Sequence, residues 1–420
     1  MPRFILSTIL ALLAAWPLRA EQQSLELEQL IDEALMHNPS LSALEARWKA
    51  DEARIPQAGA LMDPMVKFEL SNVPLSDFNF DSTPMSGKQL MVSQQFPYWG
   101  KRATRERIAV HMASAAEHTY LEREGIIINM VKQAYYSLSF LDHAIAITEK
   151  NQALLRDFVR IAETKYAVGN GLQQDVLKAQ VTLSGLRDKL IDLRRMRSQA
   201  EAQLNTVLNR PPQQPMGHVA PLTHTPFTYD TEGLQQMAIE LRPRLKAIEE
   251  NIQRWKAAED LARLGYKPDF AVNLGYRQRS FARDPVEGSD FISLGLTLNL
   301  PIYRNRKQAQ QVREAQQRTE MSKEQYETIK QQIFFEVQSL SLDVQAHKEQ
   351  AALFRSTIIP QANQALNSAL AAYEVDKVDF LTLLNHQVTL FNFEIAYFRH
   401  QIEYEKKLAE LEAVIGKRLF

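Results

Sequence analysis

The chain contains one long sequence unit twice, and this internal repeat constrains the fold more strongly than any single motif. Residues 204 positions apart match without an insertion, as in Pro39 and Pro243, Pro64 and Pro268, and Pro97 and Pro301. Beyond Pro97 the offset becomes 207, which aligns Tyr166 with Tyr373 and the two QVTL stretches, Gln180–Leu183 and Gln387–Leu390. A period this long duplicates a domain-sized unit. We expect repeat 1 at residues 21–209, a linker at 210–230 and repeat 2 at 231–420.

Each copy begins with helical periodicity that changes to strand alternation after a proline, Pro64 or Pro268. The helical patterns are Leu25–Met36 and Leu41–Ala60 in copy one, and Leu234–Leu241 and Leu245–Leu264 in copy two. Apolar residues then alternate with small or polar ones: Val66, Phe68, Leu70, Leu90, Val92 and Phe96 in copy one, and Phe270, Val272, Leu274, Tyr276, Ile292, Leu294, Leu296, Leu298 and Leu300 in copy two. About ten such residues are typical of a membrane strand, although a strand half buried in a soluble sandwich has the same pattern.

A long helical hairpin is predicted after each strand pair. No proline occurs from Lys101 to Tyr166, and apolar residues there step by three and four, as in a heptad seam interrupted at Thr148 and Gln152. The seam resumes after the glycines at 169 and 171, so the chain must fold back. A helix of that length would extend about 100 Å, which an ordinary globular domain does not accommodate. Copy two repeats the pattern, with Pro360 expected to distort its first helix.

The fold class predicted from these patterns combines α-helices with a membrane β-barrel. Each chain supplies four strands and long antiparallel helical hairpins. Four strands cannot close a barrel, and unpaired strand edges are not tolerated in lipid, so several copies must share one. Two copies would provide eight strands and three would provide twelve.

Composition and the N-terminus narrow the function. The 49 basic and 50 acidic residues give a net charge of -1, which disfavours nucleic acid as a partner. Cysteine is absent, which excludes disulfides, thiolate metal sites and a cysteine nucleophile. No Walker A, HExxH or GxSxG motif occurs. Residues 1–20 combine Arg3 with a short apolar run and are predicted to be a signal peptide.

Two motifs point to a known family. The stretch SQQFPYWGKR stands where a strand passes into a long helix, and YAVGNGLQQDVLKAQ stands at a helical turn. Together with the two-copy architecture, they resemble the TolC-type outer-membrane efflux channels over essentially the whole mature chain. The segment from Gly59 to Lys101, GALMDPMVKFELSNVPLSDFNF onward, resembles the branch that serves heavy-metal cation efflux, of the CzcC and CusC kind.

The resemblance implies a homotrimer with a 12-strand barrel in outer-membrane lipid and an α-helical barrel in the periplasm. It implies a passive exit duct for heavy-metal cations that is not an enzyme and needs no cofactor, and the missing motifs agree with this. The duct would dock to a periplasmic adaptor (membrane fusion) protein and, through it, to an inner-membrane pump of the resistance-nodulation-division class. A multidrug or type I secretion exit channel is the alternative within the family. A periplasmic coiled-coil scaffold without a barrel is an alternative of another class.

The resemblance also suggests site residues. Asp175 matches an acidic position that lines the pore just inside the helical tip, although it could simply be a solvated residue at a helix N-terminus. In the second turn, Asp376 and Asp379 carry the acidic charge as further gate candidates; the family often has glycine where Asp376 stands. The candidates for adaptor contact at the tip are Tyr166, Val168, Gly169, Leu172, Tyr373, Val375 and Val378. Tyr166 and Tyr373 also continue the heptad seam, where packing is the alternative.

Aromatic and thioether side chains complete the set of candidates. Tyr98, Trp99 and Tyr303 stand at strand-to-helix junctions and are expected at the membrane interface, with capping of a soluble fold as the alternative. Lys101 and Arg102 beside them are expected in the aqueous periplasm. Met62, Met65, Met85 and Met91 could suit copper or silver, and His111 and His118 lie two helical turns apart. Methionine more often packs and scattered histidine is more often a bystander, so we predict no metal site.

Overall fold

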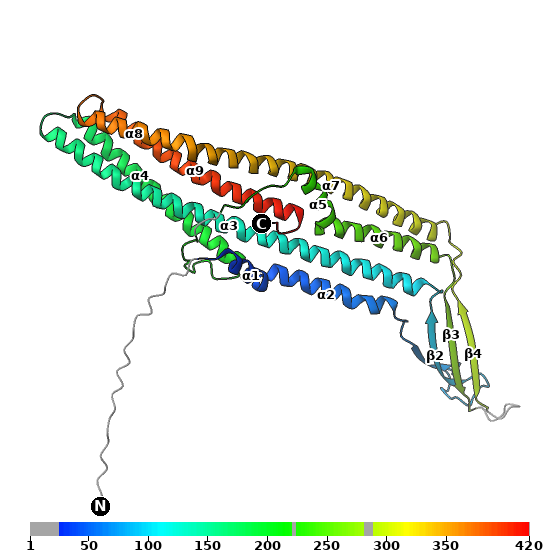
Figure 1. Cartoon of the computed structure of the whole chain (residues 1–420). Helices are drawn as coiled ribbons and strands as arrows, with labels where there is room; N and C mark the ends of the chain where they lie inside the picture. Colours follow the sequence, from blue (N-terminus) through cyan, green and yellow to red (C-terminus); the bar gives the residue numbers. More distant parts are fainter. Residues whose placement is uncertain (1–24, 221–223, 281–288, 420) are drawn as a thin grey trace, which may run out of the picture. The chain divides into compact units, whose positions relative to one another are not determined.

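The computed structural model describes residues 25–220, 224–280 and 289–419, and the predicted signal peptide lies outside these ranges. The first half contains α1 (Leu27–His37), α2 (Pro39–Gly59), β1 (Met65–Ser71), β2 (Gly87–Phe96), α3 (Lys101–Ala167) and α4 (Gln173–Val207) (Figure 1). The second half contains α5 (Thr231–Leu241), α6 (Pro243–Leu264), β3 (Phe270–Gln278), β4 (Phe291–Leu298), α7 (Gln308–Leu353), the π-helix η1 (Phe354–Ile358), α8 (Ile359–Glu374) and α9 (Phe380–Ile415).

The two halves repeat one order of elements at the offsets found in the sequence. Helices α1 and α5 begin at Leu27 and Thr231, which are 204 residues apart, and α4 and α9 begin at Gln173 and Phe380, which are 207 apart. Proline and cap residues explain several of the starts. Asn38 accepts a hydrogen bond from the backbone N–H of Ser40 (3.0 Å) at the start of α2, where Pro39 is the first helical residue.

The long helix of copy two is interrupted where proline was expected to distort it. Copy one has a single 67-residue helix, α3, whereas copy two has α7, the five-residue π-helix and α8 in series. Pro360 has no N–H to donate to the carbonyl four residues earlier. The N–H of Ile359 instead bonds to the carbonyl of Phe354, five residues back, which is the spacing of a π-turn.

The four strands form one antiparallel sheet in the order β1-β2-β3-β4. Strand β4 ends at Leu298, short of the predicted Leu300, because Pro301 follows and cannot continue a ladder. Asn299 still donates its N–H to the carbonyl of Asp269 (2.9 Å).

Contacts divide the chain into two compact units, and each unit takes residues from both repeats. The first comprises the described residues up to Asp32, together with Ala134–His224 and Leu353–Ile402. Its core joins α3, α4, α8 and α9, and includes Leu155, Phe158, Ala179, Leu366, Tyr373, Phe380 and Leu383. The heptad seam therefore packs the two hairpins against each other, as the spacing predicted.

The second unit comprises Glu33–Gln133, Thr225–Ala352 and the residues from Glu403 onward, and it contains the sheet. One core cluster joins α5, α6, α7 and the end of α9, through Leu234, Ala238, Leu245, Ile333, Val337, Leu340, Leu411 and Ile415. Glu412 also forms an ion pair with Lys132, and both side chains are buried. In the part of the chain that the structure describes, no helix is both long and apolar enough to cross a membrane.

Candidate functional site

One face of the sheet is a continuous apolar surface that the protein leaves uncovered. The register aligns Phe68, Leu90, Tyr276 and Ile292 in one row, and Val66, Val92, Leu274 and Leu294 in the next. All eight side chains are exposed, and those of Ile292 and Leu294 are 78% exposed. The predicted alternation is thus confirmed across all four strands. A face of this extent is typical of a surface that meets lipid or another protein.

The opposite face of the sheet is polar. The register brings Met65, Ser93, Asn273 and Gly295 into one row. Asn273 donates to the hydroxyl of Thr297 (2.9 Å), and Lys67 pairs with Glu69 (2.7 Å) on the same face. A sheet with one apolar and one polar face can separate an apolar environment from water.

A buried ion pair fixes the junction between the sheet and α3. The ammonium group of Lys101 donates to Asp269 Oδ1 (2.7 Å) and to the carbonyl of Lys267 (3.0 Å), and Asp269 also accepts from the N–H of Tyr98 (2.7 Å). Lys101 is only 6% exposed, so its ammonium group is bound by the protein rather than by water, and its location in the aqueous periplasm stays a prediction. Sequence reasoning missed its partner, because 168 residues separate the two.

The aromatic residues at this junction differ in exposure. Trp99 is 74% exposed and Tyr303 70%, whereas Tyr98 is half buried. The ring of Trp99 also contacts Tyr98 and Phe270, with centroids 5.4 and 5.8 Å away. Exposed amphipathic rings beside an apolar sheet face are what an interface position requires, so Trp99 and Tyr303 stay the best candidates for it.

The first helical turn joins α3 to α4 and carries Asp175. Gly169 has φ of 78°, a conformation that glycine adopts without strain. Asp175 lies in the first turn of α4 and is half buried. Within the described residues its carboxylate has no ion pair or hydrogen bond, so its negative charge is uncompensated by contact. Burial, and then the nearby charges of Asp175 and Asp376, raise the pKa of Tyr373.

The second helical turn joins α8 to α9, and its two acidic residues, unlike Asp175, have hydrogen-bond or ion-pair partners among the described residues. Asp376 has φ of 57°, which Asp tolerates better than most residues. Asp379 accepts a hydrogen bond from the N–H of Thr382 (2.8 Å), in the first turn of α9, and bonding to Thr382 lowers its pKa. Asp379 is therefore a helix cap.

Lys165, at the end of α3, connects the two turns, and sequence reasoning did not single it out. Its ammonium group forms an ion pair with Asp376, donates to the carbonyl of Tyr373 (2.8 Å) and lies 4.4 Å from the centre of the Tyr373 ring. The Lys165 side chain is 18% exposed. The charge of Asp376 is thus compensated, and Asp175 is left as the free carboxylate among the three gate candidates.

The predicted tip residues separate into surface and core. Tyr166, Val168, Leu172 and Val375 are exposed at 49%, 66%, 65% and 60%. Tyr373 is 5% exposed and packs in the core of the first unit, and Val378 packs against that core. The packing alternative therefore holds for Tyr373 and not for Tyr166.

The methionine and histidine candidates do not converge on a metal centre. Met65 and Met91 line one shallow cavity on the polar face of the sheet, whereas Met62 and Met85 are exposed. His111 pairs with Glu250 (2.7 Å), and no group of three His, Cys, Asp or Glu residues that could hold a metal occurs among the described residues.

Comparison with known proteins gives a consistent result. The family described as "Outer membrane efflux protein" matches residues 30–210 and 234–417. The pyoverdine export outer membrane protein OpmQ of Pseudomonas aeruginosa is 22% identical over 93% of this chain and 84% of its own length. The cobalt-zinc-cadmium resistance protein CzcC of Cupriavidus metallidurans is 23% identical over 87% of this chain and 84% of its own.

A solved structure of CusC, described in terms of folding and transmembrane channel formation, has the same fold with a TM-score of 0.80. It is 16% identical, and the match covers 94% of this chain and 93% of that one. The family match spans both repeats and most of the sequence. The chain belongs to the outer membrane efflux protein family.

Proposed function

We propose that three copies of this chain form the outer-membrane exit duct of a tripartite efflux system. The observation that carries the proposal is the exposed apolar face across all four strands, opposite a polar face. In the described residues β1 and β4 each pair on one side only, and lipid does not tolerate open strand edges. Three four-stranded sheets would close a 12-strand barrel, with the helical hairpins forming an α-helical barrel in the periplasm.

The cargo we propose is heavy-metal cations. The similarity to CzcC, a cobalt-zinc-cadmium resistance protein, supports this choice. So does the segment from Gly59 to Lys101, which resembles the heavy-metal branch. A ring of free carboxylates around a narrow aqueous pore attracts cations, and Asp175 would provide such a ring. Asp376 would contribute less, because Lys165 compensates it.

An organic cargo is the second candidate, and a specific observation favours it. OpmQ is a pyoverdine export protein and covers slightly more of this chain than CzcC does, at nearly the same identity. Pyoverdine is an organic molecule, so the same fold serves cargoes of different chemistry.

The partners we propose are a periplasmic adaptor and, through it, an inner-membrane pump of the resistance-nodulation-division class. The exposed apolar side chains of Val168, Leu172 and Val375, with the ring of Tyr166, offer the adaptor a contact surface at the two helical turns. Tyr373 is buried, so it would pack beneath the exposed side chains of this surface and would not contact the adaptor.

Growth of a deletion strain tests the cargo. Removing the gene from its host should lower tolerance to zinc, cobalt, cadmium or copper, and the wild-type gene should restore it. A gene carrying Leu294→Arg, on the exposed apolar face, should not restore it. Unchanged metal tolerance together with lost export of an organic compound would favour the second candidate. If the deletion changes neither metal tolerance nor the export of organic compounds, the proposal that the protein is an exit duct is contradicted.

A further inference from the structure

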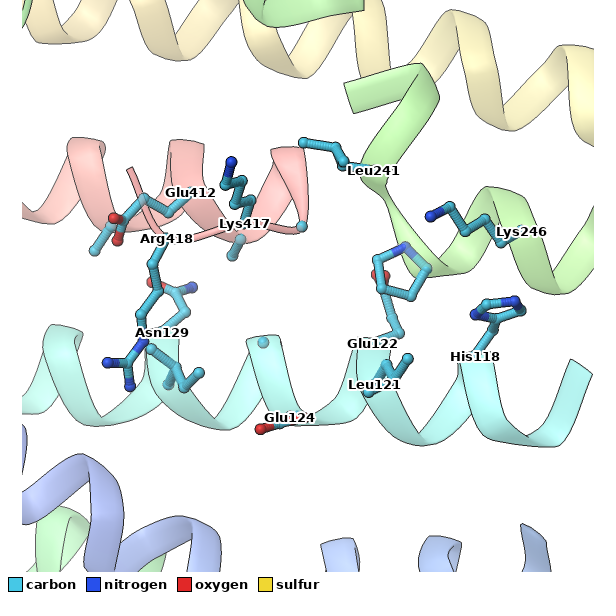
Figure 2. Close-up of a pocket in the computed structure, with 16 residues that line it drawn as sticks. His118, Leu121, Glu122, Glu124, Asn129, Leu241, Lys246, Glu412, Lys417 and Arg418 are labelled. Atoms are coloured by element: carbon cyan, nitrogen blue, oxygen red, sulfur yellow. The ribbon is translucent and has the colours of Figure 1, made fainter. Parts of the chain in front are cut away.

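A cavity of about 370 Å³ lies in the second unit, between α3, the turn from α5 to α6, and the C-terminal end of α9 (Figure 2). It uses none of the gate, tip or junction residues described above. Its size falls within the range of about 300–1,000 Å³ found for small-molecule sites. Apolar side chains form much of the lining: Leu121, Ile128, Leu241, Pro243, Ala409 and Ala413.

Two glycines shape this cavity. A Cβ at Gly125, inside α3, would have no heavy atom within 4 Å, so the cavity reaches the helix backbone there. Glycine is unfavourable inside a helix, and no side chain of the described residues packs into the space beside Gly125. Gly416 has φ of 81°, and a Cβ on it would come within 2.8 Å of Pro243. This close approach brings the end of α9 to the turn between α5 and α6.

Two of the three acidic residues of the lining, Glu122 and Glu412, already have hydrogen-bond or ion-pair partners. Glu122 accepts from the guanidinium of Arg242 (3.3 Å) and from the N–H of Arg244 (3.1 Å). Glu412 pairs with Lys132 and accepts from the N–H of Leu419 (2.7 Å). Glu124 lies on the far side of α3 from the other labelled side chains (Figure 2). The carboxylates of Glu122 and Glu412 therefore leave little negative charge for the cavity itself.

Two basic residues of the lining, Lys246 and Lys417, lack such partners: within the described ranges, neither has a side-chain ion pair or hydrogen bond. His118 Nδ1 is shielded from solvent and has no hydrogen-bond partner among the described residues. His118 and Lys246 lie on facing sides of the gap between α3 and α6 (Figure 2). The ammonium group of Lys246, unpaired among the described residues, therefore makes this end of the cavity basic, and a charged donor there suits an anionic oxygen.

We propose that this cavity binds a small amphipathic organic anion. Its charged oxygens bond to Lys246, beside the His118 ring, and its apolar body lies against Leu121, Ile128 and Pro243. Lys417, which also lines the cavity, adds attraction for negative charge. This site is independent of the exit duct, because it depends only on contacts within the second unit.

The test uses the full chain in an uncharged detergent and the probe naphthalene-2-sulfonate, which combines one anionic group with an apolar body. Isothermal titration against a detergent blank should show saturable binding of one probe per chain. The neutral analogue 2-naphthalenemethanol should bind at least about tenfold more weakly, because a hydrogen bond to a charged group is lost. Equal binding of the two, or no saturable binding of the sulfonate, would overturn the proposal.

Two variants locate the binding. Lys246→Met should weaken the sulfonate about tenfold or more while leaving the neutral analogue unchanged. Gly125→Phe should abolish binding of both, since a Cβ at this position has no heavy atom within 4 Å and the ring extends into the cavity. The matched controls are Lys256→Met on the same helix and Gly185→Phe, at another helical glycine with open space around its Cβ position. If Lys246→Met and Gly125→Phe both bind like the wild type, the cavity is not the site.

Discussion

Asp175 and Asp376 differ in how far contacts within the chain compensate their charges, and this difference decides which one can act on an ion. Asp376 forms an ion pair with Lys165, whereas Asp175 has no such partner among the described residues. A bare carboxylate beside a narrow aqueous path changes the local potential more than a paired one does. At the residue scale, the proposed gate therefore rests on Asp175.

Asp175→Asn should reduce cation selectivity and increase leak, since it removes one negative charge per subunit and any hydrogen bonds that narrow the proposed constriction. Single-channel conductance in planar bilayers, with sodium and with multivalent cations, measures both. Asp376→Asn is the matched control and should change selectivity less. A larger effect of Asp376→Asn would place the constriction at the second turn instead.

Lys165→Met should have the opposite effect on selectivity. The methionine keeps an apolar stem beside the Tyr373 ring but removes the cation that compensates Asp376. Asp376 then adds to the negative potential of the turns, so cation selectivity should rise. The same bilayer recording checks this, and unchanged selectivity would mean that Asp376 lies away from the ion path.

The Lys101–Asp269 pair should be important for stability. Both groups are largely buried, so Asp269→Asn leaves an uncompensated ammonium and should cost about 3–5 kcal/mol. Asp260→Asn is the control, because Arg107–Asp260 is an exposed pair whose loss should cost about 0–1 kcal/mol. Unfolding by denaturant in detergent compares the two variants. Equal losses of unfolding free energy in the two variants would show that the Lys101–Asp269 pair does not fix the junction between the sheet and α3.

At the scale of elements, the strands carry the most specific prediction, because their two faces differ so sharply. Leu294→Arg puts a charge on the exposed apolar face and should cost about 2–4 kcal/mol if that face lies in lipid. Thr297→Arg, on the polar face, should be milder. The yield of assembled protein in the outer membrane measures both effects. Equal losses for the two variants would mean that the apolar face does not meet lipid.

Most of the elements could be predicted from periodicity, since the repeat, the proline positions and the alternation are local signals. Contacts between distant segments could not. Gln180 and Gln387 begin the two QVTL stretches, yet Gln180 is exposed and Gln387 is buried and bonded to Asn151. The repeat predicts equal positions, but their surroundings differ. Lys165–Asp376 and Lys101–Asp269 escaped prediction for the same reason: they join residues far apart in sequence.

At the scale of the whole molecule, the central claim is that one chain cannot complete the channel. Its four-stranded sheet has two edges, β1 and β4, and an apolar face that water would not favour. If three chains close one barrel in the outer membrane, the strand edges pair with those of neighbouring chains and the apolar face lies in lipid. The family assignment is consistent with that location.

Native mass measurement on protein extracted with detergent from the outer membrane tests this claim most directly. The account predicts a stable particle with three times the mass of the mature chain. A stable monomer in detergent, or recovery of the protein in the soluble periplasmic fraction, would contradict it.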